Sequence, residues 1–372
     1  MEHLFTTSIK SILQRHFQSN SDEIFEKSQL IQYLNEKTRS ANKGSKARSS
    51  FNSLYSIYTL VKDYLAHGYD KSGDYSLYEG AKFTMLLKRA RNLPYGSKIQ
   101  NHSFNNRTND EFRKFDKTLL PILRDTQTKR YWINENFLIV MIDKIEYNLA
   151  DSIIEIIDEY IKTKQDAFQR FVKACKELQV ISKTTPQKVQ EFIFGLMDPN
   201  VDARLFEIVS YSILKYYYHD QTIIWGFEMN NLNTENLKLY KTGRTNANDG
   251  GIDFVMKPLG RFFQVTETID FKKYFLDIDK IQKFPITFII KSDESIESLK
   301  NKIRENANKT YLIRIIVDAY MACIEEVINI PILNERFSCA IKQGYLNNIL
   351  DEIVTQSVVE FNHEDFVEDE ME

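Results

Sequence analysis

The chain has few of the residues that cross-link small secreted proteins or bind zinc. Its 372 residues include three cysteines, Cys175, Cys323 and Cys339, none in a CxxC pair. An odd number of widely spaced cysteines indicates neither a disulfide framework nor a zinc site, and it favours a reducing cytoplasm. No apolar run approaches the ~18–20 residues that a membrane helix needs. The amino-terminal segment interleaves acids and bases, so we do not expect a secretion signal.

Several enzyme classes are excluded by motifs that the sequence lacks. The six histidines form no HExxH or HxH pair, which argues against zinc hydrolases and against nucleases of the HNH kind. GxxxxGK[ST] and GxSxG are both missing, so neither a P-loop nor a serine nucleophile elbow is expected. The Gly250-Gly251 pair precedes a strand-like run, whereas dinucleotide-binding glycines precede a helix.

The charge of the chain is unevenly distributed. The formal net charge is −3, but the segment from Glu360 to Glu372 holds seven acids and no Lys or Arg, which leaves +4 for the remainder. We expect residues 359–372 to form a solvated acidic tail. The 42% hydrophobic and 27% charged content is that of a globular protein, and the length predicts two domains.

The most informative stretch runs from Gly243 to Thr268, GRTNANDGGIDFVMKPLGRFFQVTET. A cluster of turn formers opens it, strand-like residues 252–256 follow, and residues 257–260 break the pattern before a second strand at 261–268. This pattern predicts a hairpin. Asp253 lies in its first strand, where a carboxylate is costly to bury unless it is paired or binds a cation.

The hairpin GGIDFV…FFQVTE resembles the core of the PD-(D/E)XK nucleases, and the likeness covers roughly the carboxyl-terminal half of the chain. In that superfamily an Asp follows a glycine-rich turn, and the next strand carries an acid or Gln, a spacer and a lysine. Asp253 matches the first position and Gln264 the second, but Thr266 stands where the lysine is expected. The resemblance implies that the acids bind Mg2+ and that a lysine orients the attacking water.

The second strand leaves two questions open. Alternation places Gln264 and Thr266 on one face and Glu267 on the other, so the family pattern favours Gln264 as a metal ligand and charge favours Glu267. The missing lysine has several candidate substitutes, which are Glu267, Lys272, Lys273 and Lys280. We favour Glu267, because it is closest in sequence and an acid suits a metal site.

The flanking segments extend the resemblance. An amphipathic pattern from Asp202 to Lys215 predicts a helix that carries Glu207, and the superfamily often places a further metal-binding Glu there. The alternation of elements predicts a mixed α/β restriction-endonuclease-like core. Its other expected elements are a first strand at 221–227, a helix at 275–283, a strand at 286–291, a helix at 294–306 and a strand at 311–317.

The amino-terminal half reads as a mainly helical DNA-recognition region. Helices are expected within residues 1–65 and over 134–178. Residues 22–65 resemble a helix-turn-helix, with a basic connection that carries no acid and whose second helix start suits phosphate contact. The residues expected to bind DNA are Lys37, Arg39, Lys43, Lys46 and Arg48 in that connection, Asn105 and Arg107 in a polar loop, and Arg244 before the hairpin.

The predicted organisation is a recognition region at 1–184, a nuclease core at 185–358 and the tail. The resemblance implies a magnesium-dependent type II restriction endonuclease of the cytoplasm that cleaves double-stranded DNA at a short specific sequence. We expect a homodimer and no membrane association, with a cognate methyltransferase that acts on the same site without needing to bind the enzyme. The alternatives are a structure-selective repair or junction nuclease and a non-catalytic DNA-binding protein that kept the fold.

Overall fold

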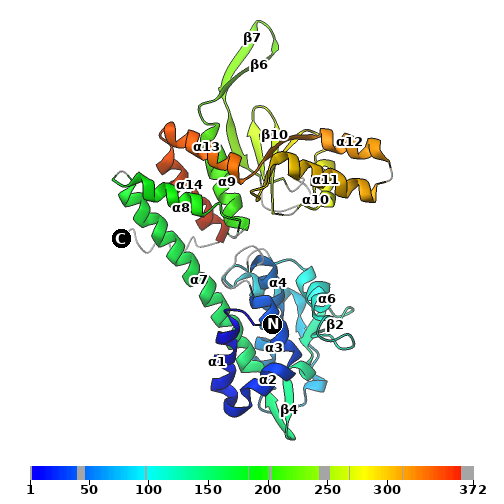
Figure 1. Cartoon of the computed structure of the whole chain (residues 1–372). Helices are drawn as coiled ribbons and strands as arrows, with labels where there is room; N and C mark the ends of the chain where they lie inside the picture. The colour runs from blue at the N-terminus through cyan, green and yellow to red at the C-terminus, as the bar shows by residue number, and fades with distance from the viewer. Residues whose placement is uncertain are drawn as a thin grey trace. The chain divides into compact units, whose positions relative to one another are not determined.

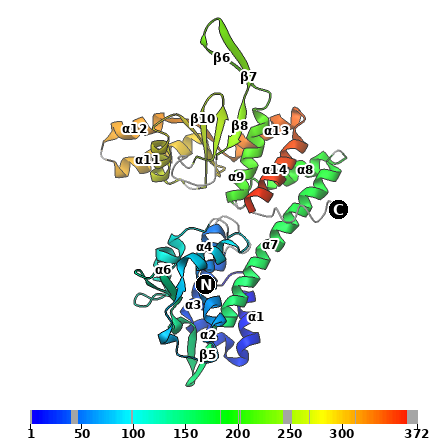
Figure 2. The same ribbon diagram turned by 180° about the vertical axis from the view of Figure 1, so that it is seen from behind.

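The computed structural model describes residues 2–39, 47–96, 99–182, 184–199, 201, 203–242, 252–267, 269–311 and 313–361. The chain folds into two compact units that divide between Phe171 and Val172. This division lies inside the long helix α7 (Ala150–Ile181), green in Figures 1 and 2, whereas the sequence places the boundary after residue 184. The early turns of α7 are buried in the first unit, for example at Ile153 and Ile157, so the helix belongs in part to each unit.

Helices enclose the apolar core of the first unit. Their amphipathic patterns bury Leu34 and Tyr55 completely, together with Tyr160 from α7. The helices predicted within residues 1–65 are confirmed in the described part of that range. In chain order the helical segments before α7 are α1 (Thr6–Phe17), η1 (Gln18–Asn20), α2 (Ser21–Lys27), α3 (Gln29–Thr38), α4 (Ala47–Ala66), η2 (Tyr75–Leu77), α5 (Phe83–Arg91), η3 (Ser103–Arg107), α6 (Thr108–Phe112) and η4 (Glu135–Phe137).

Two small sheets also belong to the first unit. One has the order β1-β3-β2, and the other is the hairpin of β4 and β5. The predicted helix over 134–178 is therefore wrong before Ala150, where α7 begins. Asp143 and Lys144 adopt left-handed φ angles of 49° and 66°, the geometry of a two-residue hairpin turn that pairs the flanking apolar residues as strands. The strands are β1 (Ala81–Lys82), β2 (Ile122–Asp125), β3 (Arg130–Ile133), β4 (Ile139–Ile142) and β5 (Ile145–Asn148).

A five-stranded sheet of order β12-β11-β10-β9-β8 lies at the centre of the second unit. The predicted hairpin is confirmed as β9 and β10, which pair antiparallel, with Gly260 of the turn at φ 68°. β10, β11 and β12 run parallel, and helices make the crossovers that parallel strands require. The mixed α/β class is thus confirmed. The strands are β8 (Lys238–Lys241), β9 (Phe254–Lys257), β10 (Arg261–Thr266), β11 (Ile286–Ile290) and β12 (Ile324–Ile328).

Helices pack on both faces of this sheet. On one face the ring of Tyr211 from α9 lies 5.2 Å from that of Phe254 in β9. On the other, the ring of Tyr274 from α10 lies 4.5 Å from that of Phe288 in β11. The helices of the unit after α7 are α8 (Pro186–Gly195), α9 (Ala203–Tyr217), α10 (Phe271–Lys280), α11 (Ile296–Thr310), α12 (Arg314–Ala322), α13 (Ile330–Lys342) and α14 (Leu346–Phe361).

Two predicted core strands do not join this sheet. Residues 221–227 do contain a strand, β6 (Thr222–Glu228), but it pairs with β7 (Asn231–Asn236) in a separate two-stranded hairpin. The predicted strand over 311–317 is wrong, because the segment enters α12. A short apolar run rich in Ile fits either a strand or a buried helix by its pattern alone. The outer position in the sheet is taken instead by β12.

Candidate functional site

Asp253 lies directly before β9, beside the end of β10. Its backbone N–H donates to the carbonyl of Phe263 at 3.2 Å, and its carbonyl accepts from the N–H of Thr242 at 3.0 Å. The carboxylate oxygen Oδ2 accepts from the N–H of Val265 at 2.7 Å. The side chain is therefore held at the edge where the carboxyl ends of the parallel strands β10 and β11 meet. This is the edge at which α/β sheets bind their ligands.

Charged side chains from both helical layers act on Asp253. Burial first, and then the Glu207 carboxylate on α9, raise the pKa of the Asp253 carboxyl from 3.8 to about 7, against a backbone hydrogen bond and the charges of Arg204 and Lys273. Glu207 is itself held by Arg204 and by Lys241, whose Nζ lies 3.3 Å away. The structure thus brings together two predicted metal ligands, Asp253 and Glu207, and keeps a proton on Asp253 up to near-neutral pH.

Gln264 and Thr266 point to the face that α10 covers, because their partners on β11 face the buried ring of Tyr274. Gln264 is 6% exposed, and its Oε1 atom is buried without a hydrogen-bond partner among the described residues. Lys273 reaches the same face from α10, with its Nζ 3.5 Å from Thr266 Oγ1. An ammonium group therefore lies next to the residue that replaces the expected lysine.

Glu267 lies on the opposite face, next to α9. Its carboxylate accepts from Nζ of Lys291 at 2.7 Å, and the Lys291 side chain is 3% exposed. Lys291 also donates to the carbonyl of Val201, and its Nζ lies 5.9 Å from the centre of the Phe206 ring. Of the two side chains that the sequence left open as ligands, Gln264 shares its face with Lys273, whereas Glu267 is engaged by a buried lysine.

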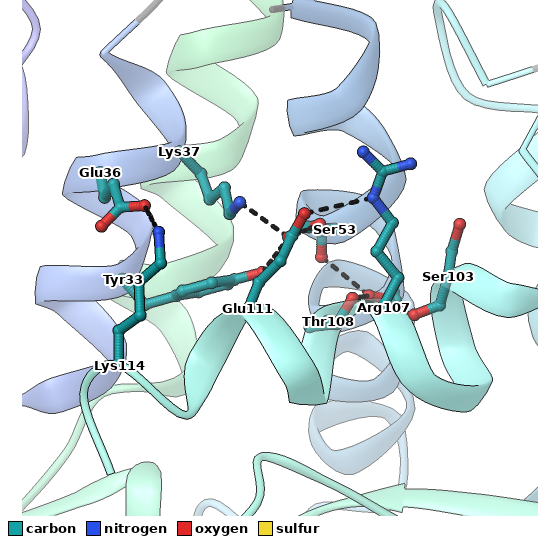
Figure 3. Close-up of polar contacts among 10 residues, drawn as sticks. Tyr33, Glu36, Lys37, Ser53, Ser103, Arg107, Thr108, Glu111 and Lys114 are labelled. Carbon is teal, nitrogen blue, oxygen red and sulfur yellow. Dashed lines mark hydrogen bonds and ion pairs between the residues drawn. The ribbon is translucent and has the colours of Figure 1, made fainter. Parts of the chain in front are cut away.

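In the first unit, two of the predicted DNA-binding residues meet on one carboxylate (Figure 3). Glu111 of α6 accepts from Lys37 Nζ at 2.7 Å and from Arg107 Nε at 3.2 Å. It also accepts from Ser53 Oγ at 2.6 Å and from the Tyr33 hydroxyl at 3.3 Å. Burial raises the pKa of the Glu111 carboxyl, but these donors outweigh it and the net pKa is lowered. Glu111 thus ties α3, α4 and α6 together and offsets the charge of both cations.

The other predicted DNA-binding residues have less definite surroundings. Arg39 is exposed at the end of α3. Asn105 is half-buried, and its Oδ1 accepts from the hydroxyl of Tyr131, so part of its amide is already in use. Three of the predicted residues, Lys43, Lys46 and Arg244, lie outside the described residues, as does the side chain of Arg48.

Two residues that organise these sites were not found from the sequence. Lys291 directly follows the apolar strand β11, and a lysine at the carboxyl end of a parallel strand is a usable signal of a site. Glu111 stands four residues after Arg107, at the spacing of an ion pair on one helix face. The long-range partners, Glu267 for Lys291 and Lys37 for Glu111, leave no signal in the local pattern.

Comparison of the chain with models of known protein families, with curated proteins and with solved structures finds no match. In the described parts of the chain, no three or more His, Cys, Asp or Glu side chains come together as a ready metal site. None of the described helices combines the length and the apolar character needed to cross a membrane.

Proposed function

We propose that the second unit is the core of a magnesium-dependent type II restriction endonuclease of the PD-(D/E)XK kind. The protein would cleave double-stranded DNA at a short specific sequence as a homodimer, beside a methyltransferase that modifies the same sequence. The observation that carries the proposal is Asp253, a carboxyl with its pKa raised to about 7 at the carboxyl edge of the sheet, beside Glu207. Perturbed carboxyl pairs of this kind are concentrated at functional sites.

The donors at this edge fit magnesium. Mg2+ is usually held by one or two carboxylates, with water and substrate phosphate oxygens completing its shell. Asp253 and Glu207 supply two carboxylates. Gln264, whose Oε1 is buried without a partner among the described residues, lies on the face that α10 covers. The bound ion would polarise the scissile phosphate and lower the pKa of a bound water. Mg2+ binding requires ionised Asp253, so metal affinity should fall as the pH drops below about 7.

Lys273 is the residue we propose in place of the missing lysine. Its Nζ lies 3.5 Å from Thr266 Oγ1 and its charge opposes the rise in the Asp253 pKa. An ammonium at this position orients a water or phosphate oxygen and offsets negative charge that develops during hydrolysis. The sequence favoured Glu267 for this role, but its carboxylate is paired with the buried Lys291, whereas Lys273 lies beside Thr266.

Digestion of phage and plasmid DNA tests the proposal. Discrete bands in Mg2+, lost in EDTA, are expected from the wild-type protein, and Asp253→Asn should bind DNA in a gel-shift assay without cutting it. Cleavage restricted to branched DNA would replace the restriction proposal with a repair nuclease. Binding without any cleavage would mean a DNA-binding protein without catalysis. Cleavage by Asp253→Asn at the wild-type rate would refute the site.

A pair of adjacent lysines tests the role of Lys273. Lys273→Ala should lower kcat by about 100-fold or more, and Lys273→Arg should recover part of this loss. Lys272→Ala is the matched control, because Lys272 is its neighbour on the same helix turn and is exposed like Lys273, and its loss should leave kcat nearly unchanged. Equal rates for the two alanine variants would remove Lys273 from the mechanism.

A further inference from the structure

The hairpin of β6 and β7 projects from the second unit, as both views show (Figures 1 and 2). We refer to its residues 222–236 as the arm. Among the described residues its sheet consists of these two strands, so their outer edges carry backbone N–H and C=O groups that no described strand pairs with. A two-stranded hairpin is only marginally stable in water without further packing. Within the part of the chain that the structure describes, the arm therefore lacks the cover that stabilises the central sheet.

Apolar side chains on the arm are exposed. Phe227 and Met229, at the tip, are 98% and 87% exposed. Ile224 and Leu232 are also exposed, and alternation places them on one face, because Ile224 pairs with Thr234 and Leu232 is two residues from it. A concentration of exposed apolar groups on a projecting element marks an interaction surface.

The charge of the arm argues against nucleic acid as its partner. Residues 222–236 contain two acids, Glu228 and Glu235, and neither Lys nor Arg. Binding to DNA depends on cations that neutralise phosphates, and the arm offers none.

The position of the arm leads to the same conclusion. After Leu237 the arm continues into β8, which starts opposite Lys257 and ends opposite Phe254. Asp253 therefore lies at the far end of β8 from the arm. DNA bound at the candidate site would meet the other end of the sheet.

The edges of the arm instead suit a second copy of the chain. Monomeric proteins usually protect exposed edge strands with lysine, proline or a covering segment, and the arm contains neither Lys nor Pro. An identical arm presents an edge of the same length and pattern, so two arms can pair around a two-fold axis. We infer that the arm is a self-association surface: the arms of two copies pair edge to edge and bury their exposed apolar side chains against each other.

Light scattering and sedimentation of the intact protein, without DNA or metal, test this inference separately from the nuclease proposal. The wild-type protein should show the mass of a dimer at micromolar concentration. The variant Phe227→Asp/Met229→Asp should raise the dimer dissociation constant at least about tenfold, because buried apolar anchors carry much of an interface. Asn233→Lys/Thr234→Lys should do the same by placing charge on the edge.

The controls separate loss of pairing from loss of folding. All four substituted residues are exposed, so circular dichroism and the melting temperature at low protein concentration should match the wild type. Ile315→Asp, on α12 and 80% exposed, should leave the dimer intact. A monomeric wild-type protein, or variants that dimerise as tightly as the wild type, would overturn the inference. The inference would also be overturned if the protein were a monomer and its arm variants bound DNA more weakly than the wild type.

Discussion

Replacing Asp253 by Asn should make the protein more stable at pH 8 and inactive. Asn has nearly the same shape as Asp and can still accept the hydrogen bond from Val265, but it cannot ionise. In the folded chain the Asp253 pKa is raised from 3.8 to about 7, first by burial and then by Glu207. The folded state therefore holds a proton that the unfolded state has released, and stability falls as the pH rises from about 4 to about 7.

The size of this effect follows from the pKa. A rise from 3.8 to about 7 corresponds to an upper limit of about 4 kcal/mol of unfolding free energy, lost by the wild-type protein above pH 7. The Asn variant avoids this loss. For a unit of this size the melting temperature at pH 8 should rise by roughly 10 °C. At pH 4, where wild-type Asp253 is protonated in the folded state, the two proteins should melt alike.

Calorimetry of the intact protein in EDTA at both pH values measures the difference, and it can follow the two units as separate transitions. Asp293→Asn, at an exposed position in the same unit, is the control and should change little. Adding Mg2+ should stabilise the wild type and not Asp253→Asn, because a ligand stabilises only the state that binds it. An Asn variant less stable than the wild type at pH 8, or a gain that is equally large at pH 4, would refute the reasoning.

Three further predictions concern the charged residues. Glu267→Gln leaves the buried ammonium of Lys291 without its carboxylate. It should lower the unfolding free energy, measured by urea denaturation, by roughly 3 kcal/mol and affect cleavage little. Loss of cleavage at unchanged stability would return Glu267 to the metal site. The pKa of Glu111 is lowered, so its contribution is present above the ordinary value of 4.5 and is lost as the pH falls below it. Glu111→Gln should therefore lower the unfolding free energy by about 2 kcal/mol at pH 7. It should also weaken the dependence of stability on pH below 4.5, and a variant with the wild-type pH dependence there would contradict this. In the triple alanine variant of Lys43, Lys46 and Arg48, the logarithmic salt dependence of DNA binding should weaken by about 0.9 for each phosphate that the protein no longer neutralises, and an unchanged slope would show that the basic connection does not touch DNA.

The sequence alone was sufficient for elements whose signals are local. The hairpin of β9 and β10 follows from turn formers that flank two apolar runs, and Gly260 adopts the left-handed φ that its turn needs. The helix with Glu207 follows from apolar residues at helical spacing. Alternation along β10 also separated Gln264 from Glu267, and the structure places them on the faces that alternation predicts.

The sequence prediction failed where one pattern of apolar residues fits both a helix and a strand. Residues 139–148 form a hairpin within a predicted helix, because the turn at Asp143 and Lys144 depends on left-handed φ angles, which are uncommon outside glycine and which the apolar pattern does not reveal. The Ile-rich run near Ile315 became a helix, and the sheet was completed by β12 instead. Short apolar runs of this kind are assigned by what they pack against.

The partners of the charged residues were decided only by the tertiary structure. Sequence proximity favoured Glu267 as the substitute for the missing lysine, yet the fold pairs it with Lys291 and brings Lys273 next to Thr266 from the following helix. Lys37 and Arg107 were predicted from separate segments, and only the fold brings them together on Glu111. The physical reason is that a strand's own pattern fixes which face a side chain points to. The charges that it meets on that face come from other elements of the chain, and only packing places them there.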